Sequence, residues 1–141
     1  MADETYGIKT VFVNVCASAS TADQAFSAGA KATLSAGLTA PTDAYALVDF
    51  DVNVTVGTPV ENATIDIYRQ GAANGAAPAP AGAYRSEYVG SVTLDHATGH
   101  YYLYGVSNVD WNTATYHAFN NSGATLTFEI NARTRTWGPA P

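Results

Sequence analysis

Two histidines and an aspartate lie close together in the second half of the sequence. His96 and His100 are separated by four positions, and Asp95 precedes the first of them. Two imidazoles and a carboxylate are a ligand set that a divalent metal could use. Because the flanks of a hairpin turn hold such ligands less reliably than one turn of a helix does, a turn with solvated histidines explains the same residues. We therefore predict no metal site.

Three aspartates form a second group of side chains with possible chemistry. Asp49 and Asp51 alternate with apolar residues, which puts both on one face of a single predicted strand. Asp66 could neighbour them across a hairpin. Calcium binding or paired-carboxylate catalysis would use such a set. Polar positions on the solvent side of an amphipathic strand explain the same residues, and a carboxylate face toward a partner is a further alternative.

No side chain has the sequence context of a catalytic nucleophile. The Gly-x-Ser-x-Gly pattern is missing, Ser91 only starts a predicted strand, and a phosphate-binding loop of the Walker type is also missing. Cys16 lies inside a predicted strand, so we expect a small buried residue rather than a reactive thiol. The sequence therefore predicts a protein that is not an enzyme and has no cofactor.

Strands must position these side chains, because alternation of apolar and polar residues is the main pattern of the chain. The clearest run extends from Val48 to Val56, with five apolar residues on one face and four polar residues on the other. Turn-forming residues such as Gly57-Thr58-Pro59 separate the runs. The runs lie at positions 11–16, 31–35, 48–56, 63–68, 92–94, 101–106, 115–119 and 125–132, and Trp137 closes a short ninth run or anchors the tail.

About eight short strands, each with one buried face, are expected to pair as two packed sheets. We predict an all-β fold, a jelly-roll-like two-sheet β-sandwich with about eight antiparallel strands. The predicted division is an N-terminal arm at 1–9, one sandwich domain at 10–137 and a C-terminal tail at 138–141. Two segments interrupt the pattern. Residues 20–30 form one helical turn or an extended crossover, and residues 71–83 form a long exposed Ala/Pro/Gly loop.

Size and charge exclude several classes of protein. A chain of 141 residues has the usual size of one domain. Six Lys and Arg against twelve Asp and Glu give a net charge of -6, so nucleic acid binding through a basic surface is not expected. A single cysteine excludes a disulfide framework within the chain. The acidic start is unlike a secretory signal and no apolar stretch is long enough for a membrane helix, so we expect neither export nor membrane insertion.

Aromatic side chains are concentrated in the second half of the sequence. Tyr102 and Tyr104 are expected to point away from the core if Leu103 points into it. Exposed tyrosines supply rigid contact area that suits protein or carbohydrate surfaces, whereas tyrosines in a sandwich short of leucine also fill the rim of the core. The sequence is consistent with both a contact surface and the rim of the core. The other members of the group are Tyr84, Tyr88, Tyr101, Trp111 and Tyr116.

The block Thr-Ala-Pro-Thr-Asp-Ala-Tyr-Ala-Leu-Val at positions 39–48 leads directly into the clearest strand. With this block, a short start and a composition rich in Ala, Thr, Gly and Val, the chain resembles the small accessory proteins of tailed-phage virions. That group includes capsid decoration (cement) proteins and tail or fibre modules. The resemblance implies a β-sandwich that binds assembled shell subunits and often oligomerises at symmetry axes.

We therefore expect a virion structural protein, namely a capsid decoration protein that binds and stabilises the assembled coat-protein shell. It would be made in the host cytoplasm and lie on the capsid surface. Its partners would be the major capsid protein or another virion protein, and further copies of itself in a dimer or trimer, with no nucleic acid and no membrane. The expected contact residues are Tyr6, Ile8, Gly71, Asn74, Pro78, Pro80, Tyr84, Trp111 and Trp137.

Two other classes of function are alternatives. A carbohydrate- or receptor-binding β-sandwich module of a phage tail or fibre predicts a platform of exposed tyrosines and Trp111, which could lie beside Asp49 and Asp51. A small hydrolase or isomerase would need the carboxylates, or His96 and His100, to converge in a pocket.

Overall fold

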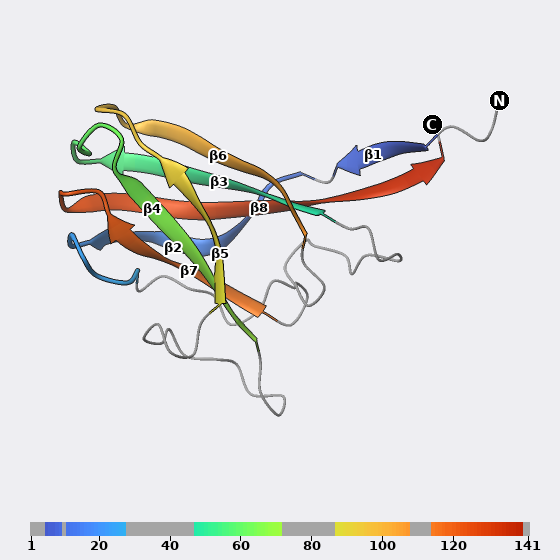
Figure 1. Cartoon of the computed structure of the whole chain (residues 1–141), viewed down its shortest axis with the longest axis horizontal. Helices are drawn as coiled ribbons and strands as arrows, with labels where there is room; N and C mark the ends of the chain where they lie inside the picture. Colours follow the sequence, from blue (N-terminus) through green and yellow to red (C-terminus); the bar gives the residue numbers. More distant parts are fainter. Residues whose placement is uncertain (1–4, 10, 28–46, 72–86, 108–113, 140–141) are drawn as a thin grey trace.

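The computed structural model of the chain describes residues 5–9, 11–27, 47–71, 87–107 and 114–139, and these residues form two antiparallel sheets (Figure 1). No helix occurs among them. The all-β class and the two-sheet arrangement are thus confirmed. The large sheet contains β1 (Thr5–Lys9), β2 (Val13–Thr21), β3 (Leu47–Val56), β6 (Gly99–Ser107) and β8 (Leu126–Pro139), and the small sheet contains β4 (Thr64–Gly71), β5 (Glu87–Thr93) and β7 (Ala114–Asn121).

The long strand β8 organises the large sheet. On one edge β8 pairs with β1 and β2, and on the other edge it pairs with β3, which in turn pairs with β6. In the small sheet β4 lies between β5 and β7. After β2 the chain turns and runs along the remaining edge of β7, where an antiparallel bridge joins Phe26 to Phe119. The described part of the 20–30 segment therefore follows the extended alternative and not the helical one.

The two-residue alternation of the sequence produces one core between the sheets. In β3, Val48, Phe50, Val52 and Val54 are buried, and the alternate residues of β8 from Leu126 to Ala132 are buried with them. The rings of Phe50 and Tyr116, one from each sheet, lie 5.0 Å apart between centroids. The core cluster also includes Ile65, Ile67, Val92, Leu94 and Ala118 from the small-sheet side and Val15 and Cys16 from β2. Cys16 is thus buried, as predicted.

The last part of β8 extends beyond the sandwich. The pairing of β3 with β8 begins at Leu47, opposite Arg135, so that residues 136–139 pair with β1 alone among the described residues. Residues 5–8 and 136–139 form a two-stranded ribbon that projects away from the sandwich (Figure 1). The register places Trp137 opposite Gly7, so Trp137 belongs to β8 and not to a separate ninth strand.

Some predictions fall outside the described residues. They include the strand predicted at 31–35 and all of the Ala/Pro/Gly loop except Gly71, which is the last residue of β4. Among the described residues no helix is long and apolar enough to cross a membrane.

Candidate functional site

The side of the large sheet that faces away from the core carries a continuous polar and aromatic surface, which we call the outer face. Successive side chains on a strand point to opposite faces, so the residues between the core positions of β3, β6 and β8 point outward. The strand register sets Asp51 opposite both Asn131 and Tyr102, and Asp49 opposite Arg133. The outer face comprises Asn14, Asp49, Asp51, Asn53, His100, Tyr102, Tyr104, Glu129, Asn131 and Arg133.

Asp49 forms a buried ion pair on this face. Its side chain is 0% exposed, and its Oδ2 accepts a hydrogen bond of 2.9 Å from the Nε of Arg133. The backbone N–H of Gly105 donates to Oδ1 over 2.8 Å. Gly105 has φ 70 and lies where the register of β3 and β6 shifts, and glycine adopts this backbone conformation without steric cost. The bulge thus directs an amide toward the carboxylate.

Aromatic rings cover this ion pair. The guanidinium carbon of Arg133 lies 4.5 Å from the centroid of the Phe12 ring and 5.9 Å from that of Tyr104. Both distances fall within the range of cation–π attraction. Asp49 and the two rings therefore contact the guanidinium of Arg133 together.

A second carboxylate, Asp51, is also nearly buried on the outer face. The Nδ1 of His100 lies 2.9 Å from both of its oxygens, and since a carboxylate only accepts, Nδ1 must carry the hydrogen. The Nδ2 of Asn131 donates to Asp51 over 3.4 Å. Glu129 lies two residues before Asn131 on the outward side of β8. The amides of Asn14, Asn53 and Asn131 each donate a hydrogen bond to it over 3.4 Å.

Three aromatic rings form a ladder along β6 beside these carboxylates. The rings of Tyr102 and Tyr104 lie 5.4 Å apart with an interplanar angle of 7°, and those of His100 and Tyr102 lie 6.2 Å apart at 12°. Such separations indicate offset rings rather than rings stacked directly face to face. Tyr102 and Tyr104 are 47% and 56% exposed, whereas Leu103 packs against the core. The predicted outward direction of the two tyrosines is confirmed.

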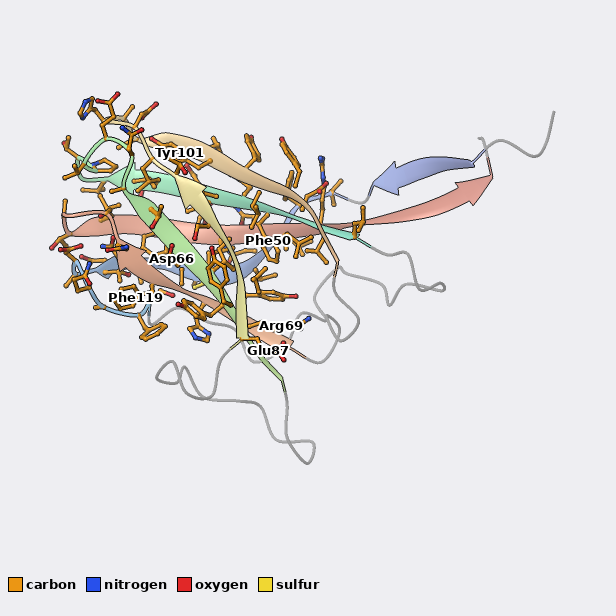
Figure 2. All side chains as sticks on the ribbon, in the orientation of Figure 1. Phe50, Asp66, Arg69, Glu87, Tyr101 and Phe119 are labelled. Carbon is orange, nitrogen blue, oxygen red and sulfur yellow. The ribbon has the colours of Figure 1, made fainter. Side chains whose placement is uncertain are left out.

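The structure corrects two expectations about the aspartates. Asp49 and Asp51 share one face, as predicted, but they are buried rather than solvated, because side chains of β6 and β8 cover them. Asp66 does not neighbour them. It lies on β4 in the other sheet, where it accepts a hydrogen bond of 2.6 Å from Ser91 (Figure 2). The turn between β3 and β4 carries the chain from one sheet to the other, so the two strands do not form a hairpin.

The two histidines of the candidate metal set do not converge. His100 contacts Asp51, whereas Nε2 of His96 lies 3.3 Å from Glu61. Asp95 accepts hydrogen bonds from the hydroxyl of Tyr101 and the N–H of Ala97, and these two bonds hold the pKa of Asp95 below its usual value. Within the described ranges no group of three or more metal-binding side chains exists.

The predicted contact residues divide between two regions. Tyr6 and Ile8 lie on β1, and Trp137 lies on the paired part of β8, so the structure brings the two chain ends together in the ribbon. Gly71 ends β4. Asn74, Pro78, Pro80, Tyr84 and Trp111 lie outside the described residues, so the Trp111 platform stays a prediction.

Six residues of this region were not among the candidate site residues predicted from the sequence: Phe12, Asn14, Asn53, Glu129, Asn131 and Arg133. Glu129, Asn131 and Arg133 alternate with buried residues of β8 and mark its outward side, which is a signal that alternation alone could have supplied. Their pairing with β3 has no such signal, because periodicity defines faces and not neighbours.

The small sheet carries an aromatic cluster around a buried histidine on the side away from the core. The ring of His117 lies 5.5 Å from Phe26 and 6.2 Å from Tyr68, and Phe119 and Tyr88 complete the cluster. Burial lowers the pKa of His117 below 6.5, because desolvation disfavours the imidazolium.

This lowered pKa predicts a pH-dependent contribution of His117 to stability. The unfolded chain binds a proton that the folded chain does not, so the contribution is lost as the pH falls below about 6.5, by at most about 1.4 kcal/mol per pH unit. We expect the wild-type protein to lose stability relative to the His117→Phe variant over this window, and the two to change in parallel above it. Urea unfolding at a series of pH values measures the difference. A difference that stays constant from about pH 7.5 to about pH 5 would contradict the prediction.

Comparison of the chain with models of protein families, with curated proteins and with solved structures finds no match.

Proposed function

We propose that this chain is a virion structural protein, a capsid decoration protein that binds and stabilises an assembled coat-protein shell. Two features support the proposal. The pairing of the strands is compatible with a jelly roll, and residues 5–8 and 136–139 form a ribbon that leaves the body. The ribbon is the observation that carries the proposal, because it unites the two terminal segments in which the sequence predicts partner contacts.

The jelly-roll description rests on the pairing of the strands. A jelly roll pairs its first strand with its eighth, its second with its seventh, its third with its sixth and its fourth with its fifth. The corresponding pairs here are β2 with β8, residues 24–27 with β7, β3 with β6, and β4 with β5. In this proposed description residues 24–27 take the place of a strand, and β1 is an extension of the edge. Viral capsid proteins are among the proteins that use this architecture.

The ribbon is suited to binding a larger assembly through its edges. A two-stranded ribbon is marginally stable by itself and presents backbone hydrogen-bonding groups along its edges. A neighbouring β-strand of a shell subunit can pair with such an edge, and this pairing orders both partners. Tyr6, Ile8 and Trp137, which the sequence predicts as contact residues, belong to this segment. The contact would hold the protein on the capsid surface after its synthesis in the host cytoplasm.

Stabilisation of the shell follows from linkage. A protein that binds the assembled shell and not its free subunits shifts the equilibrium toward assembly, in proportion to the logarithm of its concentration over the dissociation constant. Weak single contacts suffice, because copies arranged as a dimer or trimer engage several subunits of a regular lattice at once. The net charge of -6 keeps unbound copies soluble.

Co-sedimentation with purified coat shells of the virus that encodes the chain tests the proposal. We expect the wild-type protein to pellet with the shells and to raise their melting temperature. Gly7→Pro removes a backbone donor from β1 opposite Trp137, and we expect it to weaken shell binding by about tenfold or more. Melting of the isolated variant should stay near the wild-type temperature, because residues 5–8 pair only with residues 136–139 among the described residues.

Tyr104→Ala is the matched control, because it removes a large exposed side chain from the body and leaves the ribbon intact. This variant should bind shells as the wild type does. A wild-type protein that fails to pellet with shells would rule out the decoration function. Equal shell binding by Gly7→Pro and the wild type would be consistent with the decoration function, but it would exclude the ribbon as the contact with the shell.

A further inference from the structure

We propose that the outer face of the large sheet is a binding site for a neutral saccharide, which lies against the rings of Tyr102 and Tyr104 and bonds through its hydroxyls to the Glu129 carboxylate and the neighbouring amides. This inference goes beyond the proposed function and does not depend on it. The ribbon and the outer face are separate parts of the molecule, so each can fail while the other holds.

The exposed tyrosines provide the apolar half of the site. About half of the surface of Tyr102 and of Tyr104 is exposed, and the two rings lie side by side on one strand. Their rings are held parallel by each other and by His100, so little rotamer freedom remains to be lost on binding. A sugar ring presents a patch of C–H groups, and such a patch packs on the exposed faces and edges of aromatic rings. The offset of the rings along β6 suits an extended ligand.

The polar half of the site begins directly beside the rings. Asp51 is the cross-strand partner of Tyr102, and Asn131 is the partner of Asp51 on its other side. With Glu129, Asn53 and Asn14 these residues alternate carboxylate acceptors with amides, which both donate and accept. A sugar carries hydroxyls with the same dual capacity on adjacent carbons, so it can bond to several of these groups at once.

The hydrogen bonds that Glu129 accepts leave room for a ligand. The amides of Asn14, Asn53 and Asn131 reach Glu129 over 3.4 Å, which is longer than the usual limit of about 3.2 Å for a strong N–H···O bond. Hydroxyls that approach from solvent can therefore form shorter bonds to Glu129 and to the amide of Asn53. The amide of Asn14 already donates to Oδ1 of Asn131 over 3.1 Å and to the carbonyl of Cys16 over 3.0 Å. By contrast, the bonds of Asp49 to Arg133 and Gly105 are 2.9 Å and 2.8 Å, and these groups form the rigid floor of the site.

Charge disfavours an anionic ligand. Arg133 balances Asp49, whereas Asp51 and Glu129 contact imidazole and amide groups. A ligand with carboxylates or phosphates would meet these two acidic side chains and a chain of net charge -6. A protein partner would have to bury the whole polar row, and each of its groups that remained without a hydrogen bond would cost free energy. A polyhydroxylated neutral ligand meets neither obstacle.

The inference is tested by titrating the full chain with short oligosaccharides of glucose, mannose, galactose and N-acetylglucosamine. An acidic oligogalacturonate serves as the negatively charged comparison. Saturation-transfer NMR detects the contact and calorimetry measures the dissociation constant. We expect at least one neutral oligosaccharide to bind saturably below about 10 mM and the acidic one not to bind. Tyr102→Ala and Asn131→Ala should each weaken this binding by about tenfold.

Tyr88→Ala is the matched control, because Tyr88 is 60% exposed on the small sheet and should not affect binding. The absence of binding by every neutral oligosaccharide, preference for the acidic one, or loss of binding in Tyr88→Ala but not in Tyr102→Ala would overturn the inference. Shell binding that is lost in Tyr102→Ala would also overturn it, because the outer face would then be a protein-docking surface. Gly7→Pro should keep saccharide binding, which separates this site from the ribbon.

Discussion

Replacement of Arg133 by methionine is expected to lower the free energy of unfolding by about 3–5 kcal/mol. The loss follows from the burial of Asp49, whose carboxylate would remain inside the protein without the guanidinium that neutralises it. Removal of one member of a buried ion pair costs far more than removal of both, because the desolvated charge remains. Urea unfolding at pH 7 measures the change.

A double-mutant cycle separates this cause from a loss of packing. Asp49→Asn combined with Arg133→Met removes both charges, so the double variant should be more stable than Arg133→Met alone. Arg69→Met is the matched control. Arg69 pairs with Glu87 at the ends of β4 and β5, and the side chain of Glu87 is 72% exposed (Figure 2). This change should cost about 1 kcal/mol or less. A double variant no more stable than Arg133→Met would show that the arginine acts through its contacts with Phe12 and Tyr104 instead.

The second large effect is expected from Phe50→Ala, which should destabilise the protein by about 3–5 kcal/mol. Phe50 is fully buried, and its ring contacts that of Tyr116 in the opposite sheet. Truncation leaves a cavity between the two sheets, and the surrounding strands cannot close it without breaking their hydrogen bonds.

Thermal and urea unfolding of Phe50→Ala measure this effect, with Val56→Ala as the control on the same strand. Val56 is 61% exposed, so its truncation should change stability by no more than about 0.5 kcal/mol. Similar losses in the two variants would mean that the sheets are not joined through Phe50.

Local pattern predicted much of the fold. The alternation from Val48 to Val56 correctly identified the buried face of β3 at Val48, Phe50, Val52 and Val54. Tyr102 and Tyr104 were correctly assigned to the face opposite Leu103. These predictions succeeded because the direction of a side chain on a strand depends only on its position in the two-residue repeat.

Long-range pairing accounts for what the pattern missed. Arg133 is 84 positions from Asp49 in the chain, and only the register of β3 with β8 brings them together. The burial of Asp49 and Asp51 depends on that register. An interpretation based on one strand alone therefore wrongly placed their side chains in solvent. Asp66 was misassigned for the same reason, since its strand crosses to the other sheet.

The sequence alone determined the strand-rich class of the protein and the inward or outward direction of its side chains, because both depend on neighbouring residues. The tertiary structure alone decided that β8 lies between β3 and the two N-terminal strands, that the chain ends share a ribbon and that the polar residues form one surface. Backbone hydrogen bonds are the same for every pair of strands. The choice of neighbours therefore comes from the packing of the whole core, and no local stretch of sequence contains it.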